Sequence, residues 1–234
     1  RFPVRWVLGD VANQRWAELD PDTGSATLLD AMPQPEGWSN STLRPFATTH
    51  TVPSCGWMIQ QHAMAGKFDR QRADDLNLST KERAMLARGE DVTTADGTTL
   101  ESAWFRGGER APVSVLVSGD TAAMPPAWTD EVRPTLLIHE ATFLDEQQDK
   151  ADEHQHSTAT GAVASALAVG AESLALTHYS NRIKSTEEPV SEAKSAGEAL
   201  PVVALNDNDR MVVDDEGRVH HLSWTETGWA SLNI

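Results

Sequence analysis

Three short, largely apolar runs in the second half of the chain constrain the fold most, because each one ends at a cluster of polar residues. The runs span 113–117, 135–138 and 173–176, and the polar residues after them begin at Ser118 and His139 for the first two. Short apolar runs of this kind are typical of strands buried on both faces, as in parallel sheets covered by helices. Such sheets place ligands at the carboxyl ends of their strands. The sequence therefore predicts an α/β sheet with its chemistry at one edge.

Other segments supply helices and turns around this sheet. The Ala-rich stretch 157–169 predicts a helix, with Ser157 or Thr158 as its N-cap and Gly170 as its stop. Further elements are expected as a turn at 20–24, strands within 3–16, 46–59, 202–205 and 210–213, a hairpin at 91–100 and a weak helix at 189–199.

The segment 67–88 is helix-permissive and charged, with few large apolar residues. It is expected to bury little and to form a protruding arm over 66–88. Its six basic residues exceed its four acidic ones by two, whereas the whole chain has a formal net charge of −16. A charged run of this kind is either a solvated helix face or a local basic patch for nucleic acid.

The acidic composition and the single cysteine indicate the kind of environment in which the protein works. Only five of the 19 basic residues are lysines, which indicates either an acidic, solubilising surface or adaptation to a salty cytoplasm. Cys55 is the one cysteine, so no internal disulfide forms, and a reducing, cytoplasmic location is expected. No run of about 18 apolar residues predicts a membrane-spanning helix.

The polar clusters at the strand ends have the composition of a metal site. Asp120, the pair His139 and Glu140, and His178 follow the three apolar runs, and His50 follows the segment 45–49. Histidine and carboxylate are common zinc ligands when they occur together. A lone histidine is more often structural, but several at successive strand ends favour one shared metal site. His62, His154, His220 and His221 are expected to be plain surface histidines.

The residue types and order of these clusters resemble the C-terminal portion of the ribonuclease Z family of metallo-β-lactamase-fold nucleases. The motifs that carry the resemblance occur in order as Ser118–Thr121, His139–Thr142, His156–Thr158 and Thr177–Arg182. His50 followed by Gly56-Trp57, and the segment 66–100, are similar to family features too. The resemblance covers about residues 45–213.

The resemblance implies a four-layer αββα sandwich, of which this chain supplies about one sheet with its helices. It implies a metallo-β-lactamase-like domain over 1–213 that includes the arm, followed by a hairpin or tail at 214–234. It also implies a zinc-dependent endoribonuclease that removes the 3′ trailer of precursor tRNA. No membrane partner is expected. Two zinc ions per complete site and a homodimer are further implications.

Each site residue takes its expected role from the same resemblance. His50 and His178 would each bind one zinc, and Asp120 would bridge the two. Glu140 and His156 would form a catalytic pair in which His156 protonates the leaving oxygen, while zinc activates the attacking water. The expected substrate-binding residues are Ser180, Arg182, Arg70, Arg72 and Lys81.

One departure from the family keeps other functions open. The family's His-x-His-x-Asp-His run does not occur in this sequence, so each zinc would keep two protein ligands where a catalytic site usually has three. The chain is then a fragment, a chain completed by a second chain, or a metal-free relative. The alternative functions are a small-molecule phosphodiesterase or hydrolase of the same fold and a non-catalytic binding subunit.

Overall fold

The computed structural model describes residues 4–108 and 110–232. The chain divides into two compact units, one built from the flanking segments up to His62 and from Val113 onward, and the other from Ala63–Pro112. The larger unit contains all the strand-end motifs. The domain limits expected from the sequence stay a prediction.

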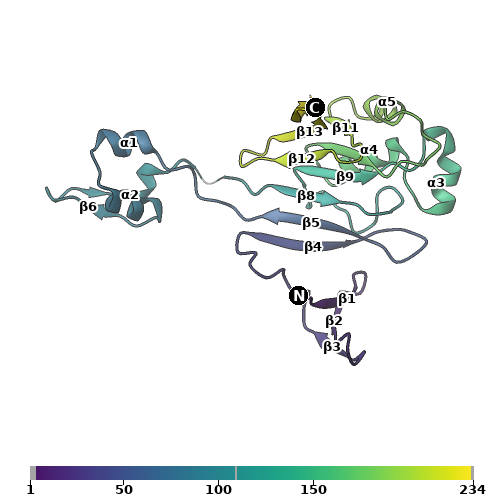
Figure 1. Ribbon diagram of the computed structural model, residues 1–234, viewed down its shortest axis with the longest axis horizontal. Helices are drawn as coiled ribbons and strands as arrows, with labels where there is room; N and C mark the ends of the chain where they lie inside the picture. The colour runs from purple at the N-terminus through teal and green to yellow at the C-terminus, as the bar shows by residue number, and fades with distance from the viewer. Residues whose placement is uncertain (1–3, 109, 233–234) are drawn as a thin grey trace. The chain divides into compact units, whose positions relative to one another are not determined.

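A six-stranded sheet in the order β11-β10-β9-β8-β5-β4 organises the larger unit (Figure 1). Strands β8 to β11 pair in parallel, whereas β5 pairs antiparallel with both β8 and β4. The bounds are β4 (Ser41–Ala47), β5 (Cys55–Gln61), β8 (Ser114–Val117), β9 (Leu136–Glu140), β10 (Leu174–Thr177) and β11 (Val202–Ala204). The three apolar runs are therefore neighbouring parallel strands, as predicted, and their carboxyl ends meet at one edge.

Helices cover one face of this sheet. Met58, Leu116 and Leu137 point to that face and pack in one buried cluster with residues of α4 (Ala159–Ala168) and α5 (Glu187–Ala196). The Thr158 side chain caps α4 by accepting a hydrogen bond from the Gly161 amide, and Gly170 follows with a φ of +64°. The predicted start and stop of this helix are confirmed.

A small antiparallel sheet covers part of the other face. It consists of β12 (Arg210–Val213), β13 (Val219–Thr225) and β14 (Gly228–Leu232). Met211, Val213 and Val219 from this sheet pack against a buried cluster that includes Leu136 and Ala175. The layers are thus helices, a large sheet and a second sheet, three of the four layers that the sequence implied.

The smaller unit, Ala63–Pro112, has a core of its own. It holds α1 (Arg70–Asp75), α2 (Thr80–Ala87), a short 3₁₀ helix (Ser102–Phe105) and a hairpin of β6 (Val92–Thr93) and β7 (Thr99–Leu100). The expectation that 67–88 buries little is wrong, because residues beyond it complete a cluster. The buried members are Ala73, Leu78, Leu86, Val92, Leu100 and Phe105. The predicted hairpin is confirmed.

The remaining elements lie in the larger unit. A three-stranded sheet near the start holds β1 (Trp6–Asp10), β2 (Arg15–Leu19) and β3 (Ala26–Leu29), while Pro3 of the strand segment predicted there lies outside the described residues. A 3₁₀ turn (Asp145–Gln147) leads into α3 (Gln148–His154), which the sequence did not predict. Within the described ranges, no helix is long and apolar enough to cross a membrane.

Candidate metal centre

The turn after β8 places Asp120 at the edge of the large sheet. Gly119 in this turn has a φ of +63°, and a Cβ on it would lie 2.9 Å from the Cys55 carbonyl oxygen. Glycine fits both the left-handed conformation and the close approach. The backbone thus fixes the position from which the Asp120 carboxylate projects.

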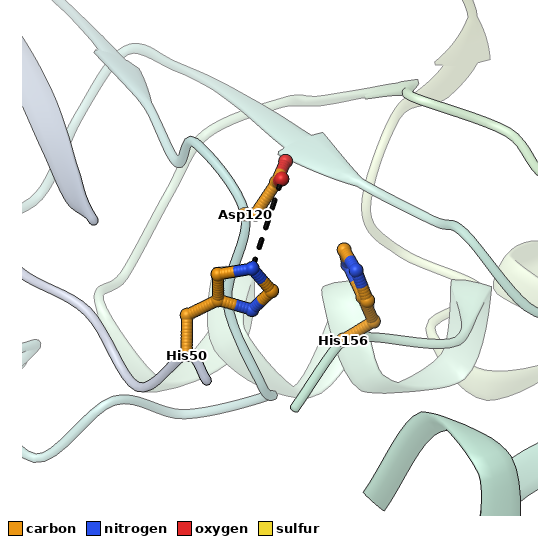
Figure 2. A group of neighbouring side chains, drawn as sticks. All are labelled: His50, Asp120 and His156. Atoms are coloured by element: carbon orange, nitrogen blue, oxygen red, sulfur yellow. Dashed lines mark ion pairs between the residues drawn. The ribbon is translucent and has the colours of Figure 1, made fainter. Parts of the chain in front are cut away.

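The two carboxylate oxygens of Asp120 face two different histidines. Oδ2 lies 3.9 Å from Nε2 of His50, and Oδ1 lies 3.6 Å from Nε2 of His178. Figure 2 shows the side chains of His50 and His156 both pointing toward Asp120, with the His50–Asp120 contact dashed. The structure therefore brings together the three residues expected to hold metal.

Hydrogen bonds on the far side of His50 set which of its nitrogens faces Asp120. Its Nδ1 lies 3.0 Å from the carbonyl oxygen of Gln155, and a carbonyl can only accept, so Nδ1 carries the proton. Gln155 ends α3 in a left-handed conformation with a φ of +53°. With its proton on Nδ1, a neutral ring would offer Nε2, the nitrogen that faces Asp120, to a metal ion.

Thr142 sets which ring nitrogen of His178 faces Asp120. Its hydroxyl donates to Oε2 of Glu140 across 2.6 Å and lies 2.9 Å from Nδ1 of His178. Because the single hydroxyl proton goes to the carboxylate, Nδ1 of His178 must donate. A neutral His178 ring would then also offer Nε2, the nitrogen that faces Asp120, to a metal ion. Two imidazole nitrogens and a carboxylate that face one another are a donor set suited to a metal ion, which favours a metal site.

Glu140 and His156 form a tight pair beside these residues. Nδ1 of His156 lies 2.6 Å from Oε1 of Glu140, and the buried Glu140 carboxylate also accepts from the amides of Thr121 and Ser157. With Nδ1 donating to the carboxylate, the other ring nitrogen of His156 is free to act. The pairing agrees with the expected roles, which remain a proposal.

The donor atoms form two overlapping groups among the described residues. His50, Asp120 and His156 make one group, and Glu140, His156 and His178 the other, with all donor atoms of a group within 4.8 Å of one another. His156 belongs to both. The structure thus shows His, Asp and Glu clusters that could hold a metal ion.

A cavity of about 520 Å³ opens beside this centre. Its lining includes Asp120, Glu140 and His178 together with Asn206 and Asp207 from the loop after β11. This opening gives the polar groups access to a substrate.

The expected substrate-binding residues fall into two sets. Ser180 is held near the centre because its amide donates to the Thr142 carbonyl oxygen across 3.1 Å, and Arg182 lies exposed two residues later. Arg70, Arg72 and Lys81 lie exposed in the other unit, where Nη1 of Arg72 donates to the Trp104 carbonyl oxygen. Only the first set can be placed beside the metal centre.

Two histidines differ from the sequence-based expectation. His139 does not face the edge of the sheet: it is fully buried, its Nδ1 lies 2.7 Å from the carbonyl oxygen of Glu140, and burial lowers its pKa. His221 is not a surface histidine, because its Nε2 is buried against Oδ2 of Asp209 at 2.8 Å. Alternation along β9 and β13 turns these side chains inward.

Sequence reasoning missed Thr142 and Gln155 as orienting residues. Thr142 stands inside the quoted motif His139–Thr142, so its position gave a signal, but a hydroxyl alone does not reveal which imidazole it will meet. Gln155 acts through its backbone carbonyl, so its residue type gave no signal of this role.

Comparison with known proteins identifies relatives over part of the chain. Ribonuclease Z of Synechococcus sp. is 39% identical over 142 residues, which are 60% of this chain and 44% of that protein. Ribonuclease Z of Halobacterium salinarum is 34% identical over 161 residues (68% and 52%), and that of Natronomonas pharaonis is 35% identical over 173 residues (74% and 56%). The chain spans about half the length of the curated relatives it matches.

Solved structures align more weakly, and no protein-family model matches the chain. The metallo-β-lactamase fold protein YhfI from Bacillus subtilis aligns with 17% identity and a TM-score of 0.46 over 75% of this chain and 52% of its own. The short form of human tRNase Z aligns with 21% identity and a TM-score of 0.39 over 82% and 48%. The sequence matches confirm the predicted resemblance: over the region that they share, this chain is similar to proteins named ribonuclease Z at 34–39% identity.

Proposed function

We propose that this chain carries part of the active centre of a zinc-dependent endoribonuclease, a phosphodiesterase that removes the 3′ trailer of precursor tRNA. The observation that carries the proposal is the placement of Asp120 between His50 and His178, whose Nε2 atoms lie 3.9 Å and 3.6 Å from its two carboxylate oxygens. The relatives named ribonuclease Z support the substrate class. The exposed Arg182 beside the centre supplies a cation for an RNA phosphate.

The donors present fit zinc. Zinc binds imidazole nitrogen and carboxylate oxygen at about 2.0–2.2 Å, so two donors of one ion lie at most about 4.3 Å apart. The separations of 3.9 Å at His50 and 3.6 Å at His178 satisfy this limit. One carboxylate oxygen is available to each of two ions. Bound zinc would supply a water of lowered pKa and polarise the phosphate.

The other residues of the centre have separate tasks in this proposal. His156, held by Glu140, delivers a proton to the oxygen that leaves the phosphate. Glu140 keeps the ring in the required tautomer through its contact with Nδ1 at 2.6 Å. Ser180 and Arg182 orient the RNA backbone, and Arg70, Arg72 and Lys81 of the smaller unit contact tRNA further from the cut.

The number of donors is lower than a complete catalytic zinc site needs. Each proposed ion keeps Asp120 and one histidine, whereas a catalytic zinc usually has three protein ligands. The missing His-x-His-x-Asp-His run is the set of donors that the family resemblance implies. We propose that another segment of the same protein or a second chain supplies it.

Zinc titration followed by a cleavage assay tests the proposal. The chain should bind zinc, and Asp120→Asn should reduce both stoichiometry and affinity. Precursor tRNA with a 3′ extension should be cut when the chain is mixed with a polypeptide that carries a His-x-His-x-Asp-His run. A mixture that binds two zinc ions and leaves the precursor intact would overturn the proposed activity.

A non-catalytic binding subunit is the second candidate, and the missing run of histidines favours it. In that case the purified chain contains no zinc, whether alone or with its partner, and still binds tRNA. Elemental analysis of the purified protein separates the two candidates.

Two further properties belong to the same proposal. We propose a homodimer, which light scattering after gel filtration would detect as twice the chain mass. We also propose a cytoplasmic location, since Cys55 is a free thiol. Secretion of the natural protein with an oxidised Cys55 would contradict this location.

A further inference from the structure

A second hollow lies beside the candidate metal centre and has a different chemical character. Its volume is about 590 Å³, and its lining consists of 207–210, Ser223, Trp224 and Trp229. Asp207 lines both this hollow and the cavity that contains Asp120 and His178. The two cavities therefore adjoin at the loop between β11 and β12.

Two exposed tryptophans form one wall of this hollow. Trp224 of β13 and Trp229 of β14 are direct cross-strand partners, with ring centroids 5.2 Å apart and ring planes at 71°. Trp224 is 60% exposed and Trp229 is 38% exposed. Tryptophan is among the side chains that gain most from burial, so an exposed pair in a concave site indicates a surface for binding.

Arg210 extends the aromatic surface. Its guanidinium carbon lies 3.9 Å from the centroid of the Trp229 ring, close enough for a cation–π contact. Arg210 is the one cation among the described residues of the lining. A planar guanidinium and two indole rings together offer flat surfaces on which another planar group can stack.

Hydrogen bonds hold this surface in place. Asp209 accepts from His221 at 2.8 Å and from the Asn206 amide at 2.9 Å, so the loop beside Arg210 is anchored to β13. The Thr225 hydroxyl donates to the Gly228 carbonyl oxygen across 2.7 Å and closes the hairpin that carries both tryptophans. A preformed surface loses less entropy when a ligand binds.

We propose that Trp224, Trp229 and Arg210 form a stacking site for unpaired nucleobases of single-stranded RNA. The proposal rests on the proposed function, which brings a single-stranded trailer to the adjoining cavity. The occupant is a base rather than a phosphate, because the exposed Asp207 carboxylate would repel an anion at the junction. Base stacking on aromatic side chains tolerates any sequence and does not depend on net positive charge, which suits a chain of net charge −16.

The test measures binding of a labelled single-stranded RNA of about 12 nucleotides by fluorescence anisotropy. Trp224→Ala and Trp229→Ala should each weaken binding by about 5- to 100-fold, and Trp229→Phe should recover most of the loss. Trp38→Ala is the matched control, because Trp38 is 41% exposed and lies outside the hollow. Duplex RNA of the same sequence should bind weakly to every variant.

Further measurements keep a folding defect apart from a binding defect. Arg210→Gln leaves both indoles in place and should weaken binding less than either alanine variant. Circular dichroism and zinc titration of each variant should match the wild type. Equal binding of the RNA by the wild type and both alanine variants, or no binding by the wild type, overturns the stacking site. A concentration-dependent dimer lost in Trp224→Ala would also overturn it, since a second copy would then occupy the surface.

The outcome is separable from that of the proposed nuclease. A chain that binds zinc and supports cleavage, yet binds RNA identically with and without the tryptophans, contradicts only the stacking site. A chain that binds no zinc but loses RNA affinity in both alanine variants contradicts only the nuclease.

Discussion

Nδ1 of His156 lies 2.6 Å from Oε1 of the buried Glu140, and this contact leaves only Nε2 of the ring free to act. A carboxylate behind an imidazole can serve two purposes: it raises the basicity of a metal ligand, or it orients a proton donor. His156 belongs to both donor groups, so its role has to be separated by measurement.

His156→Ala should lower the cleavage rate of the completed enzyme by about 10²- to 10⁴-fold, because a general acid is lost. Zinc affinity, measured by competition with a chelator, should stay near that of the wild type. A fall in zinc affinity that matches the loss of activity would show His156 to be a ligand instead. Glu140→Gln should reproduce the rate effect more weakly.

Asp120→Asn should abolish binding of the second zinc and weaken the first, because the bridging negative charge is removed while the shape is kept. Calorimetric titration with zinc gives both the stoichiometry and the affinity. Asp207→Asn is the control, since Asp207 lines the same cavity as an exposed carboxylate. Equal titration curves for the two variants would contradict a bridging role for Asp120.

Thr142→Val should weaken zinc binding by about 10- to 100-fold, as is usual when a group that orients a ligand is removed. Its hydroxyl lies 2.9 Å from Nδ1 of His178, and we expect this contact to favour the tautomer whose Nε2 can bind zinc. Thr142→Ser keeps the hydroxyl and should restore most of the affinity. If both variants bind zinc like the wild type, the tautomer of His178 does not depend on Thr142.

Leu86→Ala should destabilise the smaller unit by about 2–5 kcal/mol, because Leu86 is fully buried in its core. Hydrogen exchange should show the loss over Ala63–Pro112, while zinc titration of the larger unit stays unchanged. Leu76→Ala is the control, since Leu76 is exposed. A uniform loss of protection over the whole chain would show that the two units unfold together.

Alkylation of Cys55 should depend on pH differently in the folded and the unfolded protein. Burial raises the pKa of the Cys55 thiol in the fold, and the thiolate is the reactive form. At a pH near the ordinary thiol pKa of about 8.5, the folded protein should therefore react more slowly with iodoacetamide than the protein in urea. The rate in the folded protein should still be rising at a pH where the unfolded rate is already constant. Identical pH profiles would contradict the raised pKa.

The elements that the sequence predicted are those with local signals. Thr158 and Gly170 mark the ends of α4 by side-chain and backbone chemistry that a reader of the sequence can recognise. The parallel strands follow from short apolar runs, and the edge where Asp120 and His178 meet follows from parallel pairing. The missed helix α3 is polar except for Ala151, so it has no apolar periodicity from which a helix could be predicted.

The parts that could not be predicted depend on contacts distant in sequence. Leu100 and Phe105 bury Ala73 and Leu86 in the smaller unit, and nothing in the segment 67–88 reveals these partners. The sequence around His221 does not indicate burial, because its partner Asp209 is brought to it only by the pairing of β12 with β13. The choice of ring nitrogen at His50 and His178 rests on acceptors 105 and 36 residues away.

The Thr142 hydroxyl has one hydrogen to give, and it touches Glu140 and His178 at once. Protonation of the acid pair and occupancy of the His178 position therefore share an energetic coupling through a single atom. If a cation binds at His178 as proposed and changes the proton affinity of the pair, linkage requires that protonation of the pair change the cation affinity by the same factor. Under the proposed roles, Thr142 would link metal binding to proton transfer without taking part in either.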